Sequence, residues 1–130
     1  MIVNAYVDGA AHPSRGRASI GVVIEDVSSK VLIGKELSIR SSDNNHAEYA
    51  ALLFVLGRAL QLGHRHLKVH SDSEVMVKQI QGEYRCKGKF SKMHQVCLFL
   101  IESFEHFELV HIGRKENREA HLLAQHALRP

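Results

Sequence analysis

Short runs rich in apolar and β-branched residues predict three β-strands at the start of the chain. They cover residues 2–8, 19–26 and 31–39. The polar segment 27–30 is typical of a hairpin turn, so we expect these strands to pair antiparallel. Asp8 and Gly9, at the end of the first stretch, predict a turn or bulge there.

From residue 44 onward, the spacing of apolar residues changes to that of amphipathic helices with short strands between them. Helices are predicted over residues 44–62, 72–81, 89–104 and 116–128, and strands over 66–71 and 107–112. Asp43 or Asn44 suits the N-cap of the first helix, and Gly63 its end. The later strands follow helices and should therefore pair parallel. We expect an α/β fold with a five-stranded mixed sheet, in a single domain spanning residues 1–130.

Composition supports a folded protein of this class. The 130 residues suffice for one core, and 45% hydrophobic with 24% charged residues is typical of globular proteins. No apolar run suggests a membrane span, and the N-terminus lacks a signal-peptide pattern. Cys86 and Cys97 form no CxxC pattern, so we expect reduced thiols and a cytoplasmic location. The formal charge of +3 is compatible with a nucleic-acid partner, nothing indicates a protein partner, and a monomer is expected.

Three of the 14 acidic residues fall at positions where an unpaired carboxylate is costly. Asp8 ends an apolar strand, Glu48 lies on or beside the buried face of a helix, and Asp72 follows a strand directly. Each also has a local interpretation: Asp8 as a turn residue, Glu48 as a partly exposed helix acid, and Asp72 as an N-cap. If the elements that carry them adjoin in one sheet, the three carboxylates instead form a cluster. Such a cluster requires a cation to offset the repulsion between the carboxylates.

Hard divalent cations are the expected partners of such a carboxylate cluster, because Mg²⁺ and Mn²⁺ prefer oxygen ligands. Two ions would suit the hydrolysis of a phosphodiester. One would lower the pKa of the attacking water, and the other would stabilise the leaving oxygen.

Four motifs in register resemble those of the type 1 ribonucleases H, over nearly the whole chain. They are AYVDGAA with Asp8, NNHAEYAAL with Glu48, SDSEVMVKQIQGEY with Asp72, and GRKENREAHLLA with Asn117 and His121. The resemblance implies a ribonuclease H-like fold with helices on both faces of the sheet. It further implies hydrolysis of the RNA strand of an RNA–DNA hybrid by two Mg²⁺ or Mn²⁺ ions, leaving 5′-phosphate and 3′-hydroxyl ends.

The resemblance also implies roles for particular residues. Asp8, Glu48 and Asp72 would be catalytic metal ligands, with Asp8 bridging the two ions and Gly9 contacting metal beside it. His121 stands at the fourth catalytic and metal-ligand position. Contacts with the nucleic acid are implied for Gly9, Ala10, Ala11, Asn44 and Asn45. Recognition of the 2′-hydroxyl by such contacts distinguishes RNA from DNA.

His121 departs from the family pattern, in which an acid is usual at this position; plant reverse-transcriptase-like relatives share the histidine. On its own, His121 is a boundary residue at the edge of an amphipathic helix. At a metal site it would remove one negative charge and favour Mn²⁺ over Mg²⁺. Its protonation should lower activity on the acid side of neutral pH.

Two loops depart from the pattern as well. Residues 12–16 replace a glycine-rich turn of the family, and Asp43 stands where Thr is common. A mobile histidine often found before the last helix has no clear counterpart. Arg114, Lys115 and Glu116 are the candidates to replace it.

A basic stretch, residues 78–92, contains five cations against one acid, with Tyr84 and Phe90 interleaved. Such a run is commonly a solvated surface. Because the chain also contains the four motifs, we favour a surface that binds along nucleic-acid phosphates, with Lys87 and Lys89 among its contacts.

Two other functions are compatible with parts of the pattern. A binding module for hybrid or duplex nucleic acid would keep the motifs but lose catalysis through His121. A 3′–5′ exonuclease of the related DEDDh type fits less well, because it requires Asp-x-Glu on the first strand, where this chain has Asp8, Gly9 and Ala10.

Overall fold

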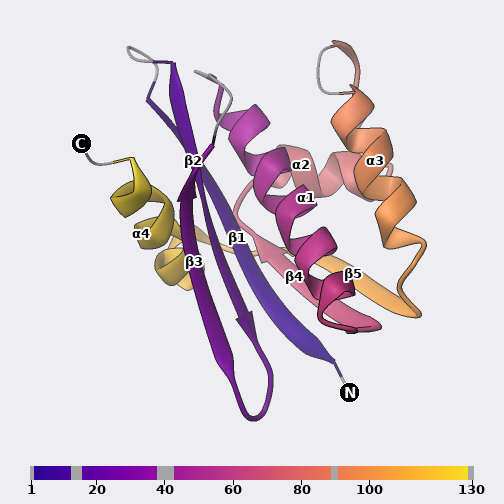
Figure 1. Cartoon of the computed structure of the whole chain (residues 1–130). Coiled ribbons are helices and arrows are strands. Elements are labelled where there is room, and N and C mark those ends of the chain that lie inside the picture. The colour runs from indigo at the N-terminus through magenta and orange to yellow at the C-terminus, as the bar shows by residue number, and fades with distance from the viewer. Residues whose placement is uncertain (1, 13–15, 38–42, 89–90, 129–130) are drawn as a thin grey trace.

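In the part of the chain that the structure describes, five strands form one mixed sheet in the order β3-β2-β1-β4-β5 (Figure 1). This computed structural model describes residues 2–12, 16–37, 43–88 and 91–128. The strands are β1 (Val3–His12), β2 (Arg17–Glu25), β3 (Lys30–Glu36), β4 (His66–Ser71) and β5 (His106–His111). The helices are α1 (Asn44–Gln61), α2 (Glu74–Ile80), α3 (Ser91–Ile101) and α4 (Arg118–Ala127), with a short 3-10 turn, η2 (Arg114–Asn117), before α4.

The pairing of the strands confirms the predicted mixed sheet. β1, β2 and β3 pair antiparallel, whereas β4 pairs parallel with both β1 and β5. Helices α1, α2 and α3 lie on one face of the sheet, and α4 lies on the other, against β2 and β3 (Figure 1). The expected cover of helices on both faces is therefore also confirmed.

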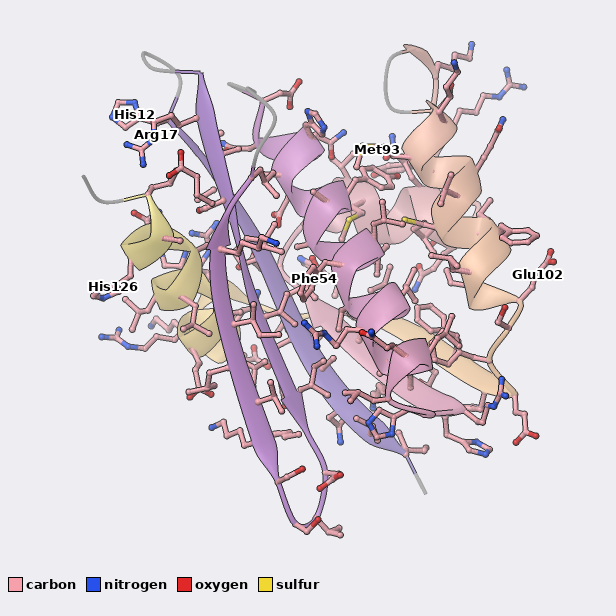
Figure 2. All side chains as sticks on the ribbon, viewed as in Figure 1. His12, Arg17, Phe54, Met93, Glu102 and His126 are labelled. Atoms are coloured by element: carbon pink, nitrogen blue, oxygen red, sulfur yellow. The ribbon has the colours of Figure 1, made fainter. Side chains whose placement is uncertain are left out.

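The hydrophobic core lies between the sheet and α1. Its fully buried side chains come from alternate positions of the strands and from one face of the helix: Ala5, Val7, Ile20, Val22, Leu67, Val69, Leu52, Val55 and Leu56. Partly buried residues, among them Phe54 on α1 and Met93 on α3, pack against this core (Figure 2). Burial of these apolar surfaces fixes α1 on the sheet and so places Glu48.

The ends of α1 follow the predicted capping chemistry. The Asp43 carboxylate caps the helix by accepting a hydrogen bond of 2.8 Å from the Asn45 amide. At the other end, Leu62 is the C-cap, and Gly63 follows with φ +85°, a conformation that favours glycine.

The first strand is longer than predicted, and the expected turn at Asp8-Gly9 is wrong. β1 continues to His12 because this segment pairs with β2: Gly9 lies opposite Ile20, and His12 lies opposite Arg17. Asp8 therefore lies within the strand. The β-rich run ends at Asp8, so the ladder with β2 was not visible in that pattern.

Other predicted boundaries shift by a few residues. α2 begins at Glu74, and α3 ends at Ile101 rather than at residue 104. The last predicted helix divides into η2 and α4. The predictions for residues 38–39 and 89–90 lie outside the described residues. Among the described helices, none has the length and apolar character that crossing a membrane requires.

Gly21 on β2 allows α4 to lie directly against the sheet. A Cβ atom at this position would overlap the carbonyl oxygen of Ala120 and approach the Ala124 amide nitrogen to 2.7 Å. The Ser19 hydroxyl, on the same face of β2, donates a hydrogen bond to the carbonyl of Ala124. These contacts fix the position of the helix that carries His121.

Candidate metal centre

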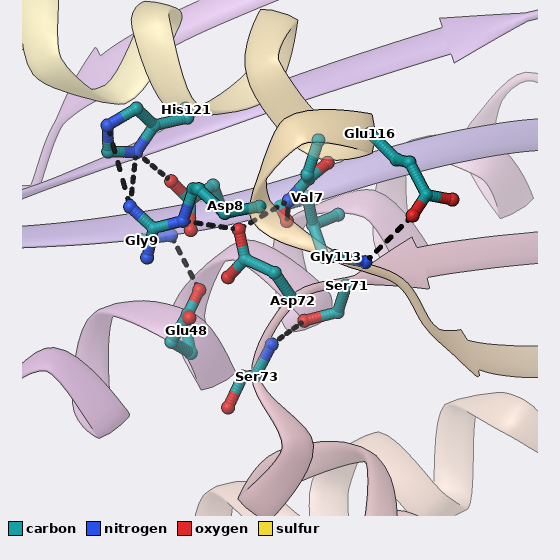
Figure 3. A network of polar contacts seen from close by, with 12 residues as sticks. Val7, Asp8, Gly9, Glu48, Ser71, Asp72, Ser73, Gly113, Glu116 and His121 are labelled. Atoms are coloured by element: carbon teal, nitrogen blue, oxygen red, sulfur yellow. Dashed lines mark hydrogen bonds and ion pairs between the residues drawn. The ribbon is translucent and has the colours of Figure 1, made fainter.

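The structure brings together the three acids singled out in the sequence. The side chains of Asp8 on β1, Glu48 on α1 and Asp72 after β4 each offer a ligand oxygen, and these oxygens lie within 4.8 Å of one another (Figure 3). Asp8 and Asp72 are adjacent because β1 and β4 are parallel neighbours, with Val7 paired to Ser71. The acids therefore meet at the carboxyl end of β4, beside the first turns of α1.

A close contact between β1 and α1 brings Glu48 to the other two acids. A Cβ atom at Gly9 would approach the carbonyl carbon of Ala47 and the amide nitrogen of Glu48 far below contact distance. The missing side chain lets the two backbones touch, and the Gly9 amide donates a hydrogen bond of 2.7 Å to Glu48 Oε1. The close approach explains the glycine directly after Asp8 better than the turn we expected there.

The local interpretations of the three acids are wrong. Asp72 does not cap α2, because the Ser73 hydroxyl accepts the hydrogen bond from the Met76 amide, and Ser71 Oγ accepts one from the Ser73 amide. Asp8 is only 1% exposed and Glu48 only 7%. All three carboxylates thus remain available to the cluster.

Burial gives the cluster an unusual protonation state when no cation is bound. It raises the pKa of the Glu48 carboxyl to about 9, and the negative charges of Asp8 and Asp72 add to the shift. Burial, and then the charge of Asp72, also raise the pKa of Asp8, whereas the hydrogen bond to His121 and the charge of Arg114 oppose the rise. Glu48 therefore holds a proton at neutral pH until a cation displaces it.

Glu48→Gln should make the metal-free protein more stable than the wild type at about pH 9. Because the folded-state pKa of Glu48 is raised from 4.5 to about 9, its proton stabilises the fold fully below about pH 4.5, and this stability is lost as the pH rises through about 9. At ~1.4 kcal/mol per pKa unit, the effect reaches a few kcal/mol. Thermal unfolding in EDTA at about pH 6 and pH 9 measures it.

Glu102→Gln is the matched control, since Glu102 is exposed beyond the end of α3 (Figure 2). The melting temperature of this control should fall with pH as in the wild type, whereas that of Glu48→Gln should fall less. Parallel curves for all three proteins would contradict the buried, protonated state of Glu48.

Asn117, which the sequence analysis named only as part of the fourth motif, connects two of the elements that form the site. It is 1% exposed, and its Nδ2 donates to the carbonyl of Val7 at 2.8 Å and to Asp72 Oδ2 at 3.3 Å. Asn117 thus links β1 to the acid after β4. Two buried oxygens, Asp8 Oδ1 and Asn117 Oδ1, have no hydrogen-bond partner among the described residues. A buried carboxylate oxygen in this state is suited to coordinate a cation.

His121 on α4 faces the acids, as the fourth motif implies (Figure 3). Its Nδ1 lies 2.9 Å from Asp8 Oδ2, and its side chain is 27% exposed. His121 therefore contacts the cluster and does not merely border the helix.

Of the three candidates in the loop before α4, Arg114 forms an ion pair with one of the acids. Its Nε lies 2.9 Å from Asp72 Oδ2. One of its terminal nitrogens lies 3.0 Å from His121 Nδ1 and 3.5 Å from Nε2. Glu116 instead accepts a hydrogen bond from the Gly113 amide. Arg114 thus bridges Asp72 and His121.

A cleft of about 230 Å³ opens beside the cluster. Its lining includes Gly9, Ala10, Ala11 and Asn44, four of the positions implied to contact nucleic acid. Asn45 follows in the first turn of α1 and is half-buried. A larger cavity of about 490 Å³ lies between α2, α3 and β5 and includes none of the three acids.

The basic stretch is only partly described. Lys87 is exposed in the loop after α2, and Lys89 lies outside the described residues. The loop folds back on α2, with the Lys78 ammonium 5.1 Å from the centre of the Tyr84 ring. Neither observation tests a contact with nucleic acid, so the roles of Lys87 and Lys89 stay predictions.

Comparisons with known proteins show the family and the fold of the chain. A family model described as reverse transcriptase-like matches residues 6–127. A ribonuclease HI from Halobacterium salinarum is 29% identical over 127 residues, which cover 97% of this chain and 64% of that protein. The chain spans between 36% and 64% of the length of the curated relatives that it matches first.

Solved structures show the same fold. The crystal structure of RNase H1 from Halobacterium salinarum has a TM-score of 0.90 and 29% identity, and the match covers 98% of both chains. The crystal structure of LC11-RNase H1 in complex with an RNA/DNA hybrid has a TM-score of 0.79 and 30% identity, over 97% of this chain and 96% of that one. The chain therefore belongs to the reverse transcriptase-like family of type 1 ribonucleases H.

Proposed function

We propose that the chain is a metal-dependent endoribonuclease that hydrolyses the RNA strand of RNA–DNA hybrids. The observation that carries this proposal is the convergence of Asp8, Glu48 and Asp72, with ligand oxygens within 4.8 Å of one another. The ribonuclease HI relative and the likeness to a ribonuclease H1 bound to an RNA/DNA hybrid support the choice of substrate.

The residues of the cluster fit a pair of hard divalent ions. The donors are carboxylate oxygens, and the buried Asp8 Oδ1 has no hydrogen-bond partner among the described residues. Asp8 would contact both ions, with Glu48, Asp72 and His121 completing the ligand set. Bound Mg²⁺ or Mn²⁺ would lower the pKa of the attacking water and neutralise charge on the phosphate.

The chain's own residues prepare the site before any ion binds. The Gly9 amide holds Glu48 in place, and Asn117 holds Asp72 against β1. The cleft along Gly9–Ala11 and Asn44 is open to a nucleic-acid backbone, and amide side chains there would hydrogen-bond 2′-hydroxyls. Lys87 and Lys89 would add phosphate contacts that weaken with salt.

A substrate panel tests the proposal. The purified protein is incubated with an RNA–DNA hybrid, duplex RNA and duplex DNA of the same sequence, with Mg²⁺ or Mn²⁺. Internal cleavage of RNA in the hybrid alone is expected. Equal cleavage of all three duplexes, or no cleavage with either metal, would contradict the proposal.

A hybrid-binding module that lacks catalysis is the second candidate, and one observation favours it. His121 stands where an acid would add a negative charge to the metal site, so a second ion is held less strongly. Tight binding of the hybrid without cleavage would identify this function.

A monomeric state, the absence of a protein partner and a cytoplasmic location also remain predictions.

His121→Asp should lower the preference for Mn²⁺ that we propose for the wild type. An imidazole nitrogen binds Mn²⁺ more readily than Mg²⁺, whereas a carboxylate suits both. The ratio of the cleavage rates in Mn²⁺ and Mg²⁺ is the measurement, and it should fall in the variant. His126→Asp on the same helix is the control, since its side chain is exposed on α4 (Figure 2). The same ratio in all three proteins would show that His121 does not bind the metal.

A further inference from the structure

Arg114 places a positive charge among the groups that would bind the second ion. Its guanidinium contacts Asp72 Oδ2 through Nε at 2.9 Å and reaches the His121 ring at 3.0 Å. The Asp72 side chain is 5% exposed, so the guanidinium pairs with an almost completely buried carboxylate. Arg114 is therefore a member of the cluster.

The contacts divide the cluster into two parts. Asp8 Oδ1 has no hydrogen-bond partner among the described residues, and Glu48 Oε1 accepts a hydrogen bond from the Gly9 amide. Neither of these two oxygens forms an ion pair with a side chain that the structure describes. The other part, Asp72 with His121, is already occupied by the guanidinium. One part of the cluster thus lacks a positively charged partner among the described residues, and the other part already has one.

The charges of the cluster also indicate that one divalent ion binds more readily than two. Once a cation has displaced the proton of Glu48, the three carboxylates and one guanidinium carry a net charge of −2, which a single divalent ion neutralises. A second ion would bring the net charge to +2 with Arg114 in place and to +1 once Arg114 leaves, so displacement of Arg114 reduces the repulsion. The Arg114 side chain is 60% exposed and belongs to the short turn η2, so it can swing into solvent without disturbing the core.

We propose that Arg114 competes with the second divalent ion for Asp72 and His121. The protein then binds one ion readily and a second one only as the guanidinium is displaced. This inference rests on the proposed metal centre, but it concerns ion binding and does not require that the hybrid is cleaved.

Binding of Mn²⁺ without nucleic acid tests the inference. Electron paramagnetic resonance of free Mn²⁺ gives the number of bound ions and their affinities for the wild type and Arg114→Gln. We expect the weaker ion to bind at least about tenfold more tightly in Arg114→Gln, because a charge-assisted pair with a buried carboxylate is removed. The tighter ion should change much less.

Arg118→Gln is the matched control, because it removes the same charge from an exposed position in the first turn of α4. It should leave both affinities within about threefold of the wild type, as expected for a screened surface charge. Equal effects of the two substitutions, with Mn²⁺ still bound by the wild type, would overturn the competition and leave the metal centre intact. Absence of Mn²⁺ binding in every protein would overturn both.

A second measurement reports on Arg114 itself. The Nε–H resonance of Arg114, assigned by comparison with Arg114→Gln, should shift when Mg²⁺ is added to the wild type, as the pair with Asp72 breaks. A resonance that stays unchanged while Mg²⁺ saturates the site would show that the guanidinium and the ions bind together, contrary to the inference.

Discussion

Asp8→Asn should lower kcat for cleavage of the hybrid by about 10³-fold or more, while the fold persists. Asp8 is the most deeply buried of the three acids, and its Oδ1 has no hydrogen-bond partner among the described residues. The amide has nearly the same shape but no charge to attract a cation. It also presents a hydrogen-bond donor toward the cluster. Both changes weaken the binding of metal.

Single-turnover cleavage and Mn²⁺ binding are measured together for this variant. Asp26→Asn is the control, since the Asp26 carboxylate accepts hydrogen bonds only from Ser28 and Ser29 among the described residues, in the turn between β2 and β3. It should cleave at the wild-type rate. Substantial cleavage by a folded Asp8→Asn protein would contradict the role of Asp8.

Gly21→Ala should destabilise the protein by about 3 kcal/mol or more, because the new methyl group meets backbone atoms that cannot move alone. Its carbon would overlap the carbonyl oxygen of Ala120 and lie 2.9 Å from the carbonyl carbon. The helix α4 must then shift away from β2, and it carries His121 away from Asp8. Activity should fall together with stability, although Gly21 is not among the acids.

Urea unfolding measures this effect, and Gly57→Ala provides a control of opposite sign. A Cβ atom at Gly57 has no neighbour within 4 Å among the described residues, and the residue is exposed on α1. Alanine there should stabilise the helix by ~0.5–1 kcal/mol. A Gly21→Ala protein as stable as the wild type would show that α4 is not held as closely as the structure indicates.

The elements of the fold could be predicted because the sheet and α1 share one core with clear periodicity. Residues such as Val22, Val69 and Leu52 are fully buried and recur at the spacing of a strand or a helix. The end of β1 could not be predicted in the same way. The part after Asp8 is held by the ladder with β2, which depends on residues far along the chain.

The three acids could be selected from the sequence because a strand end or a buried helix face is a costly place for a charge. Whether any of them has only a local role, such as capping a helix, could not be decided from the sequence. Ser73 and Asp72 are both good N-caps by composition, and only the structure shows that Ser73 makes the capping bond. The ion pair of Arg114 could not be predicted from the sequence either, since it depends on how η2 turns a long side chain toward Asp72.

The chemical ends of the cleaved RNA test the central claim most directly, that the acids hold metal ions which activate water on the RNA strand. The protein is incubated with an RNA–DNA hybrid in ¹⁸O-labelled water, with Mn²⁺ or with EDTA, and the RNA products are analysed by mass spectrometry. Attack by water predicts 3′-hydroxyl ends, 5′-phosphates that contain one ¹⁸O, and no cleavage in EDTA. Products with a 2′,3′-cyclic phosphate, or cleavage that persists in EDTA, would contradict it.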